Sequence, residues 1–378
     1  MKKSKLVFVV NVDWFFLSHR LPIAKAALLK GYEVHIICKD TGKMGQISES
    51  GIIVHDVSFS RGGTRIYDEL STLFSLNKIL KEIKPDIIHA VTIKPVIYTG
   101  LLLHSFGLKP KFVAAISGLG YIFSATSFKA KFLKYLTVLL YKLAFYHKKK
   151  VVIFQNTTDE RTLSSIAKLR NNEKVLIKGS GADLGVYNFT EEPVGESIKV
   201  IMACRLLKEK GVYEYVDAAK LIKSRLNNVE FLLAGTPDSE NPNSVLLSEL
   251  TEWDENGVIQ YLGQCDNIPK LFSESHIVTM PSYYGEGVPK VLIEAAACSR
   301  PIVTTDNPGC RDSIIPDVTG LLIPIKNSQY LADSLTALIV NKKMRVEMGK
   351  KARAFAIENF DVRNVVKEHL DVYQDSIN

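Results

Sequence analysis

Residues 276–306 read HIVTMPSYYGEGVPKVLIEAAACSRPIVTTD. HIVTMPS and PIVTTD are short apolar runs typical of buried strands, and KVLIEAAAC between them has the composition of a helix. A strand, a helix and a second strand in this order predict two parallel neighbours joined by a crossover helix. This stretch therefore predicts a parallel α/β sheet.

The same alternation occurs in two series along the chain. A chain of 378 residues exceeds the roughly 250–300 residues at which a single core stops growing, so two domains are expected. We predict an α/β fold with two doubly wound, Rossmann-like domains. The predicted strands are KLVFVVNV (5–12), YEVHIIC (32–38), DIIHAV (86–91), KFVAAIS (111–117) and KVVIFQNT (150–157) in the first series, and IKVIMACR (198–205), VEFLLAG (229–235), VIQYLG (258–263), HIVTMPS (276–282) and PIVTTD (301–306) in the second.

A turn-rich segment, GSGADLGVYNFTEEPVGES (179–197), separates the two series. We therefore predict an N-terminal domain at 1–180, a linker at 181–198 and a C-terminal domain at 199–360. Ligands of open parallel sheets bind beyond the carboxyl ends of the strands. The substrates are thus expected in a cleft where the two sheets face each other.

The composition argues against a disordered, a disulfide-rich or a membrane-spanning protein. Hydrophobic residues make up 46% of the chain, which is typical of a folded protein. The five cysteines show no C-x-x-C spacing, which indicates a reducing compartment and neither a zinc site nor a disulfide framework. The first apolar run ends after about five residues, and no stretch reaches the roughly 20 apolar residues of a membrane span. The cysteines are Cys38, Cys204, Cys265, Cys298 and Cys310.

Charge is divided unevenly between the two halves of the chain. Residues 1–190 hold 28 Lys and Arg against 13 Asp and Glu, whereas residues 191–378 hold 20 against 27. No acidic residue lies between Asp86 and Asp159. Within that span, SFKAKFLKYLTVLLYKLAFYHKKK (127–150) mixes lysines with Phe, Leu and Tyr at helical spacing, the pattern of an amphipathic helix on an anionic lipid surface.

Contact with an anionic membrane is the favoured interpretation of residues 127–150, because each lysine near such a surface contributes about 1 kcal/mol. The alternative is a solvated helix whose lysines only keep the protein soluble. Nucleic acid is not expected as a partner, since the chain has no recognised binding motif and its second half is acidic.

Two carboxylates, Glu286 and Glu294, flank the start of the helix predicted in 276–306. On one helix they would lie about 12 Å apart along the axis. With Glu286 in the loop and Glu294 on the second turn, both can face one elongated ligand. Two acids in a loop and a helix also occur by chance, so the pattern gains weight only from a second element.

The start of this helix supplies an anion site between the two acids. Pro289 suits the first helical position, where its missing N–H costs nothing. The N–H groups of Gly287, Val288 and Lys290 would carry about half a positive charge. A sugar nucleotide matches the layout: sugar hydroxyls on the first acid, diphosphate on the amides, and ribose on the second acid.

The second element is ACRLLKEKG (203–211), which places Arg205 and Lys210 beyond the carboxyl end of the strand IKVIMA. The chain has no D-x-D motif or histidine cluster to bring a metal to a diphosphate, and a cationic pair can neutralise it instead. We predict no metal and no cofactor beyond the sugar-nucleotide substrate. Taken alone, R-x4-K is also the pattern of two solvated surface cations.

Three segments of the second half resemble one known family in combination. IMACRLLKEKG (201–211), YYGEGVPKVLIEAAACSRPIVTTD (283–306) and NPGCRDSIIPDVTGLLIP (307–324) resemble the retaining glycosyltransferases of the GT-B fold, family 4, and most of all the members that build bacterial surface polysaccharides. NVDWFFLSHRLPIAKAALLKGYEVHII (11–37) and AAISGLGYIF (114–123) look like amino-terminal segments of that subgroup. The resemblance thus covers nearly the whole chain.

The resemblance implies roles for matching residues. In the family the Arg and the Lys of this pattern bind the nucleotide diphosphate, and Arg205 and Lys210 match them. The first Glu of the E-x7-E pattern contacts the transferred sugar and the second contacts the ribose, and Glu286 and Glu294 match these positions. Both assignments agree with the interpretation of the residues themselves.

Further implications concern the base, the last helix and the acceptor. Backbone around Gly263 and Cys265 is implied to meet the base, and a helix in 361–378 to cross back onto the first domain. UDP is favoured over GDP by family habit. The acceptor is expected to be a saccharide on undecaprenyl diphosphate, because the basic segment 127–150 would hold the protein peripherally at the cytoplasmic face of the inner membrane.

Departures from the family pattern affect the acceptor side. Many members have a histidine where this chain has Ser117, followed by Gly118, and the usual amino-terminal Gly-Gly loop is replaced by NVDWFFLSH. His19 or His89 could take over this polar role, although a lone histidine at a strand end is often structural. Asp312 stands where the family usually has a Glu.

Two other classes of function share part of these features. A UDP-sugar 2-epimerase of the same two-domain architecture would need neither an acceptor nor a basic membrane face, and a catalytically silent membrane scaffold would transfer nothing. We favour front-face transfer of a hexose or N-acetylhexosamine, as the family implies. A glycosidase-like nucleophile would need a second carboxylate about 5 Å away, and neither Glu286 nor Glu294 fits that pair if each binds a different part of the donor.

Overall fold

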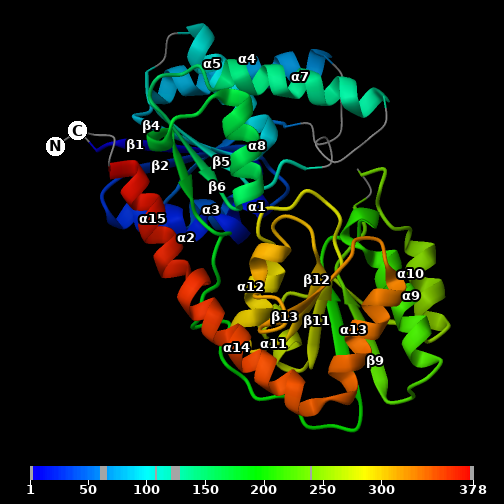
Figure 1. The fold of residues 1–378 in the computed structure, drawn as a ribbon. Coiled ribbons are helices and arrows are strands. Elements are labelled where there is room, and N and C mark those ends of the chain that lie inside the picture. The colour runs from blue at the N-terminus through cyan, green and yellow to red at the C-terminus, as the bar shows by residue number, and fades with distance from the viewer. Residues whose placement is uncertain (1–2, 60–65, 107–108, 121–127, 239–240, 375–378) are drawn as a thin grey trace. The chain divides into compact units, whose positions relative to one another are not determined.

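The computed structural model describes residues 3–59, 66–106, 109–120, 128–238 and 241–374. The chain divides into two compact units (Figure 1): Met1–Ser180 with Arg363–Asn378, and Gly181–Val362. Each unit contains one parallel sheet with helices on both faces. The predicted fold class, two Rossmann-like α/β domains, is confirmed.

The first unit is built on a seven-stranded parallel sheet in the order β3-β2-β1-β4-β5-β6-β7. All five strands predicted in this half are present. The sequence missed β3 and β7, because neither contains a fully buried residue and both lie at sheet edges. The strands are β1 (Lys5–Val12), β2 (Glu33–Lys39), β3 (Ile53–Asp56), β4 (Ile87–Val91), β5 (Lys111–Ile116), β6 (Lys150–Phe154) and β7 (Lys174–Leu176).

Alternating side chains of β1 point to two separate cores. Phe8 and Val10 join the core under α1, α2, α3 and α15, whereas Val7 and Val9 join the core under α4, α5, α7 and α8. This alternation is the period of two expected for a strand buried on both faces. The helices are α1 (Asp13–His19), α2 (Leu21–Leu29), α3 (Met44–Ser48), α4 (Ile66–Ile83), α5 (Ile93–Phe106), α7 (Phe128–Ala144), α8 (Thr157–Ala167) and α15 (Val362–Gln374), with a 3₁₀ turn, η1 (Asn171–Glu173).

The second unit is built on a six-stranded parallel sheet in the order β10-β9-β8-β11-β12-β13. All five predicted strands are present, and β13, a four-residue edge strand with two half-exposed positions, was missed. The strands are β8 (Ile198–Ala203), β9 (Val229–Ala234), β10 (Gln260–Gly263), β11 (Ile277–Met280), β12 (Ile302–Thr305) and β13 (Gly320–Ile323). The helices are α9 (Val212–Lys223), α10 (Leu247–Glu255), α11 (Ile268–Ser273), α12 (Lys290–Ala297), α13 (Ser328–Val340) and α14 (Lys342–Phe360), with 3₁₀ turns η2 (Lys208–Lys210) and η3 (Arg311–Ser313).

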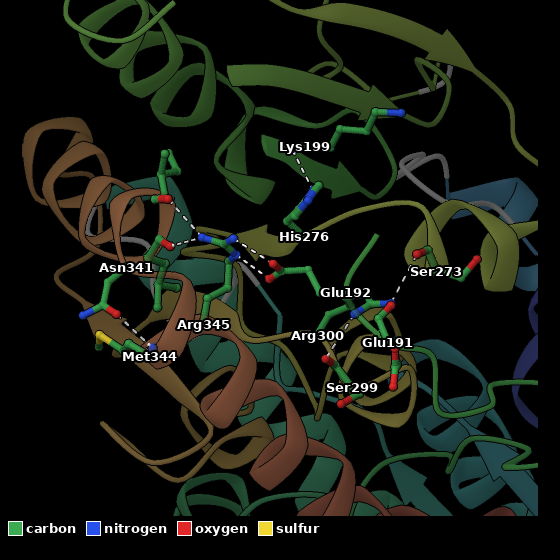
Figure 2. A network of polar contacts seen from close by, with 12 residues as sticks. Glu191, Glu192, Lys199, Ser273, His276, Ser299, Arg300, Asn341, Met344 and Arg345 are labelled. Carbon is green, nitrogen blue, oxygen red and sulfur yellow. Dashed lines mark hydrogen bonds and ion pairs between the residues drawn. The ribbon is translucent and has the colours of Figure 1, made fainter. Parts of the chain in front are cut away.

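The predicted linker, 181–198, is fastened to the second unit through residues 190–192. Glu192 forms a bidentate ion pair with Arg345 of α14, with N–O distances of 2.6 and 2.9 Å. The Arg300 guanidinium donates to the Glu191 carbonyl at 2.9 Å and to Thr190, as Figure 2 shows for the Glu191 and Arg345 contacts. The segment is therefore part of the unit and not a free tether.

The chain passes between the units at two adjacent points. The Ala182 N–H donates to the Phe360 carbonyl at 2.8 Å, and the Val362 N–H donates to the Ala182 carbonyl at 3.0 Å. Gly181 has a φ of 73°, and a Cβ there would lie 2.8 Å from the Val362 Cα, so the close approach requires glycine. The last helix, α15, then packs in the core of the first unit through Tyr373.

Candidate functional site

The proposed donor site forms at the carboxyl edge of the second sheet. β8, β11 and β12 are neighbours there, and they are followed by 204–211, 281–289 and 306–312. Because parallel strands end at the same edge, Arg205, Lys210 and Glu286 come together although up to 81 residues separate them in sequence.

Lys210 and Glu286 form a direct ion pair. Each side chain is only 12% exposed, and the Lys210 ammonium also lies 5.5 Å from the centre of the Tyr284 ring. Burial raises the pKa of the Tyr284 phenol, Glu286 raises it further, and Lys210 and Arg205 oppose the increase. The electrostatic environment of Tyr284 thus includes both predicted cations, Arg205 and Lys210, and the first predicted acid, Glu286.

Arg205 lies in a more open position. Its guanidinium is 3.6 Å from the Asp238 carboxylate, and its side chain is 43% exposed. A half-exposed guanidinium can bind a phosphate without first leaving a strong partner, because exposed ion pairs are worth little. The two predicted cations therefore differ: one is held on Glu286, and the other is accessible.

The second acid, Glu294, is buried on α12. Its carboxylate pairs with the Lys290 ammonium at 3.0 Å. Burial raises the pKa of the Tyr187 phenol. The charge of Glu294 and a hydrogen bond between Tyr187 and Glu294 raise this pKa further. Tyr187 comes from the predicted linker, and no local pattern predicted that it would lie beside Glu294.

The helix that follows the loop begins one residue later than predicted. Pro289 is its N-cap, with φ −65° and ψ 124°, and Lys290 is its first residue. The N–H groups of Leu292 and Ile293 donate to the Pro289 carbonyl. Val288 is 5% exposed and belongs to the hydrophobic core, so its side chain anchors the helix start.

The turn after β12 packs directly on this loop. A Cβ at Gly309, whose φ is 82°, would lie 1.7 Å from the Gly287 carbonyl oxygen, so only glycine fits. The Gly309 N–H donates to Asp312 at 3.3 Å. Asp312, which stands where the family usually has a Glu, therefore stabilises the turn that packs against Gly287.

The predicted base contacts lie at the end of β10. Gly263 has a φ of 63°, and its carbonyl accepts the Gly235 N–H at 2.7 Å. The Cys265 sulfur lies 3.9 Å from the same carbonyl. β10 is two strands from β8, so these residues lie along the same carboxyl edge as Arg205.

The acceptor-side candidates lie in the first unit and differ in exposure. The His89 ring is fully buried, stacks on His369 and bonds Tyr373 at 2.6 Å, so we assign it to the core and not to the acceptor side. His19 is partly exposed, stacks on Phe15 and bonds its carbonyl at 3.2 Å.

The predicted loop 117–118 also contacts the buried Arg20. Ser117 is partly exposed and accepts a weak bond from the Arg20 guanidinium at 3.4 Å. Gly118 follows with a φ of 100°. The last residues of the segment AAISGLGYIF, 121–123, lie outside the described residues.

The basic segment 127–150 is not one continuous helix. α7 ends at Ala144, and Lys150 begins β6, where its side chain is only 9% exposed and pairs with Glu173 at 2.8 Å. Lys150 is therefore unavailable to a membrane, whereas Lys148 and Lys149 are exposed. Over the part of the chain that the structure describes, no helix is both long and apolar enough to cross a bilayer.

Within the described ranges, no group of three or more His, Cys, Asp or Glu side chains is arranged to hold a metal ion. The five cysteines are unpaired.

Comparison with known families agrees with this architecture. Residues 187–355 match the family model for glycosyl transferases group 1, and residues 5–156 match the model for glycosyl transferase 4-like domains. Together the two matches cover most of the chain. The protein belongs to the group 1 glycosyltransferases, with the two-domain GT-B fold.

Individual relatives span nearly the full length. A Campylobacter jejuni N,N'-diacetylbacillosaminyl-diphospho-undecaprenol alpha-1,3-N-acetylgalactosaminyltransferase is 28% identical, with 95% of this chain and 97% of the relative covered. An Escherichia coli UDP-Gal:alpha-D-GlcNAc-diphosphoundecaprenol alpha-1,3-galactosyltransferase is 22% identical over 92% and 90%. The crystal structure of Anabaena Alr3699/HepE in complex with UDP has a TM-score of 0.77 at 19% identity, over 98% and 100% of the two chains, which shows the shared fold.

Proposed function

We propose that this glycosyltransferase moves a hexose or N-acetylhexosamine from a UDP-sugar to a saccharide carried on undecaprenyl diphosphate, with retention of anomeric configuration and without a metal. The observation that carries the proposal is the meeting of Lys210, Glu286 and Arg205 at the edge where β8 and β11 end. The names of the Campylobacter and Escherichia relatives support the acceptor class.

The donor would lie along this edge with its diphosphate on the two cations. Arg205 is exposed enough to receive a phosphate, and Lys210 can exchange the Glu286 carboxylate for phosphate oxygens. Glu286 would then accept hydrogen bonds from the sugar hydroxyls. Glu294, held by Lys290, would accept bonds from the ribose.

Transfer would proceed on the front face of the sugar. The bond between the anomeric carbon and the phosphate oxygen breaks, and the acceptor hydroxyl oxygen bonds to the same face of that carbon. The acceptor proton passes to the departing diphosphate oxygen. Arg205 and Lys210 would stabilise the negative charge on that diphosphate, a preorganised effect worth about 3–4 kcal/mol per donor group.

The acceptor would be met at a membrane surface. On α7 the side chains of Phe132 and Tyr135 are 69% and 71% exposed, and Phe74 of α4 is 71% exposed. Exposed aromatic residues next to lysines are typical of helices that lie in a lipid interface. A peripheral position at the cytoplasmic face of the inner membrane follows from this proposal.

Vesicle flotation tests the membrane contact. Wild-type protein is expected to float with phosphatidylglycerol vesicles and not with phosphatidylcholine vesicles. Phe132→Ser and the double variant Lys148→Gln/Lys149→Gln should each reduce the bound fraction. The control replaces Lys342 and Lys343 on α14 by Gln and should bind normally; equal binding by all variants would contradict the contact.

The reaction is tested by incubating the protein with a panel of UDP-sugars and a synthetic lipid-diphosphate saccharide. Proton NMR of the product should show the same anomeric configuration as the donor. An inverted product would remove the retaining mechanism. Conversion of UDP-N-acetylglucosamine without any acceptor would support the 2-epimerase alternative, and no turnover of any donor would support a silent scaffold.

A further inference from the structure

One buried hydroxyl, that of Ser282, connects the two turns that carry Lys210 and Glu286. Ser282 is fully buried, and its Oγ lies 3.1 Å from Glu286 Oε1 and 3.1 Å from the Glu209 carbonyl oxygen. It also accepts the Tyr284 N–H at 3.2 Å. We propose that Ser282 is a positioning residue that holds the Glu286 carboxylate for the donor sugar; the inference rests on the proposed function.

The hydroxyl is fixed in place from both sides. The Ser282 carbonyl accepts a bond from Thr305 at the end of β12. The Tyr283 N–H donates to the Glu209 carbonyl at 2.9 Å, and Asn243 donates to the Glu209 carboxylate. Ser282 and Glu209 therefore connect the η2 turn to the loop after β11 by several hydrogen bonds.

A hydroxyl has one hydrogen, so Ser282 can donate to only one of its two acceptors. Each acceptor also has a second donor. The Glu209 carbonyl accepts the Tyr283 N–H, and Glu286 Oε1 accepts the Lys210 ammonium. The carboxylate is the stronger acceptor because hydrogen bonds to ionised groups are shorter and stronger than neutral ones.

A bound diphosphate would compete with Glu286 for Lys210. Once the ammonium turns to the phosphates, the carboxylate loses its cation in a position that is only 12% exposed. The Ser282 hydroxyl then keeps Glu286 Oε1 in place while the carboxylate binds a sugar hydroxyl. Ser282 therefore acts on the sugar through Glu286 and does not touch the nucleotide.

The test compares two ligands in two variants. Titration calorimetry gives the dissociation constants of UDP and of whichever of UDP-glucose, UDP-galactose, UDP-N-acetylglucosamine and UDP-N-acetylgalactosamine the wild-type protein binds most tightly. For Ser282→Ala we expect UDP binding within about twofold of wild type and UDP-sugar binding weaker by roughly tenfold, because a hydrogen bond to a charged group is lost. Ser282→Cys, which keeps a weak donor, should fall between.

Thr279→Val is the matched control. Thr279 is also buried on β11, and its hydroxyl donates to the Val303 carbonyl at 2.8 Å. Both variants lose a buried hydroxyl, and thermal unfolding should show that both fold. The assignment would be overturned if the ratio of UDP-sugar affinity to UDP affinity were the same in Ser282→Ala as in wild type. It would also be overturned if Thr279→Val changed this ratio as much as Ser282→Ala does. A wild-type protein that binds no UDP would instead remove the proposed function itself.

Discussion

Lys210 and Arg205 follow the same strand but have different surroundings, and this difference sets the expected effect of removing each. Arg205→Ala should lower kcat/KM roughly 10²–10³-fold with little change in the melting temperature, because Arg205 is half exposed. Lys210→Ala should lower it as much and also destabilise the fold, because Glu286 loses its cation in a mostly buried site.

Lys208→Ala is the control for both variants. Lys208 is an exposed cation two residues from Lys210, and its removal should leave kcat/KM within about twofold of wild type, since exposed charges contribute little. Unchanged turnover in both Arg205→Ala and Lys210→Ala would contradict the assigned roles. Steady-state kinetics and differential scanning fluorimetry give the two readouts.

Buried histidines predict a pH dependence of stability. Burial lowers the pKa of His369 to about 3, with Arg20 adding to the decrease, and burial also lowers the pKa of His89 well below its usual range. Below about pH 6.5 the unfolded chain binds protons that the folded chain does not. The free energy of unfolding should therefore fall as the pH drops from 6.5 to 5, by up to about 1.4 kcal/mol per pH unit for each histidine.

The measurement is urea unfolding at pH 7, 6 and 5. His369→Gln should flatten the acid slope by up to about 1.4 kcal/mol per pH unit. His104→Gln, which removes an exposed histidine, serves as the control and should retain the wild-type slope. Identical slopes in all three proteins would show that His369 is not the buried neutral group described above.

At the scale of elements, the predicted linker 181–198 is held to the second unit by a contact that its sequence did not indicate. Turn-forming residues indicated a linker between the two domains, and local composition contains no information about a partner 153 residues away. The Arg345 guanidinium is 3% exposed and Glu192 is 11% exposed. The segment predicted as a linker is thus held by a buried ion pair.

Glu192→Gln should cost about 3 kcal/mol of unfolding free energy, because it leaves the buried Arg345 without a carboxylate. Glu274→Gln breaks the exposed Lys270–Glu274 pair on α11 and should cost less than about 0.5 kcal/mol. Urea titration followed by circular dichroism measures both variants. A loss in Glu192→Gln no larger than that in Glu274→Gln would contradict the role of the linker.

At the scale of the whole molecule, the buried strands were predictable because parallel strands leave continuous apolar runs. The edge strands β3, β7 and β13 were not, since their partly or fully exposed positions interrupt that apolar pattern. Arg205, Lys210 and Glu286 were predictable because the parallel order of β8 and β11 dictates one common edge. The proposed role of Ser282 could not be predicted, because a single serine at a strand end carries no distinguishing signal.

His89 is buried in the core of the first unit, which its local sequence did not indicate. A histidine near a strand end suggested a polar role, but only the packing of α15 onto the first sheet shows that Tyr373 and His369 enclose it. Contacts made by a helix nearly 300 residues later in the chain cannot be inferred from the local pattern.

UDP titration in the presence of EDTA, with wild-type protein and Lys210→Ala, tests the central claim most directly. The claim is that Arg205 and Lys210, which follow β8, bind the donor diphosphate without a metal ion. We predict that wild type binds UDP equally well with EDTA and with Mg²⁺, and that Lys210→Ala binds it at least about tenfold more weakly. Binding that requires Mg²⁺, or that is unchanged in Lys210→Ala, would contradict the account.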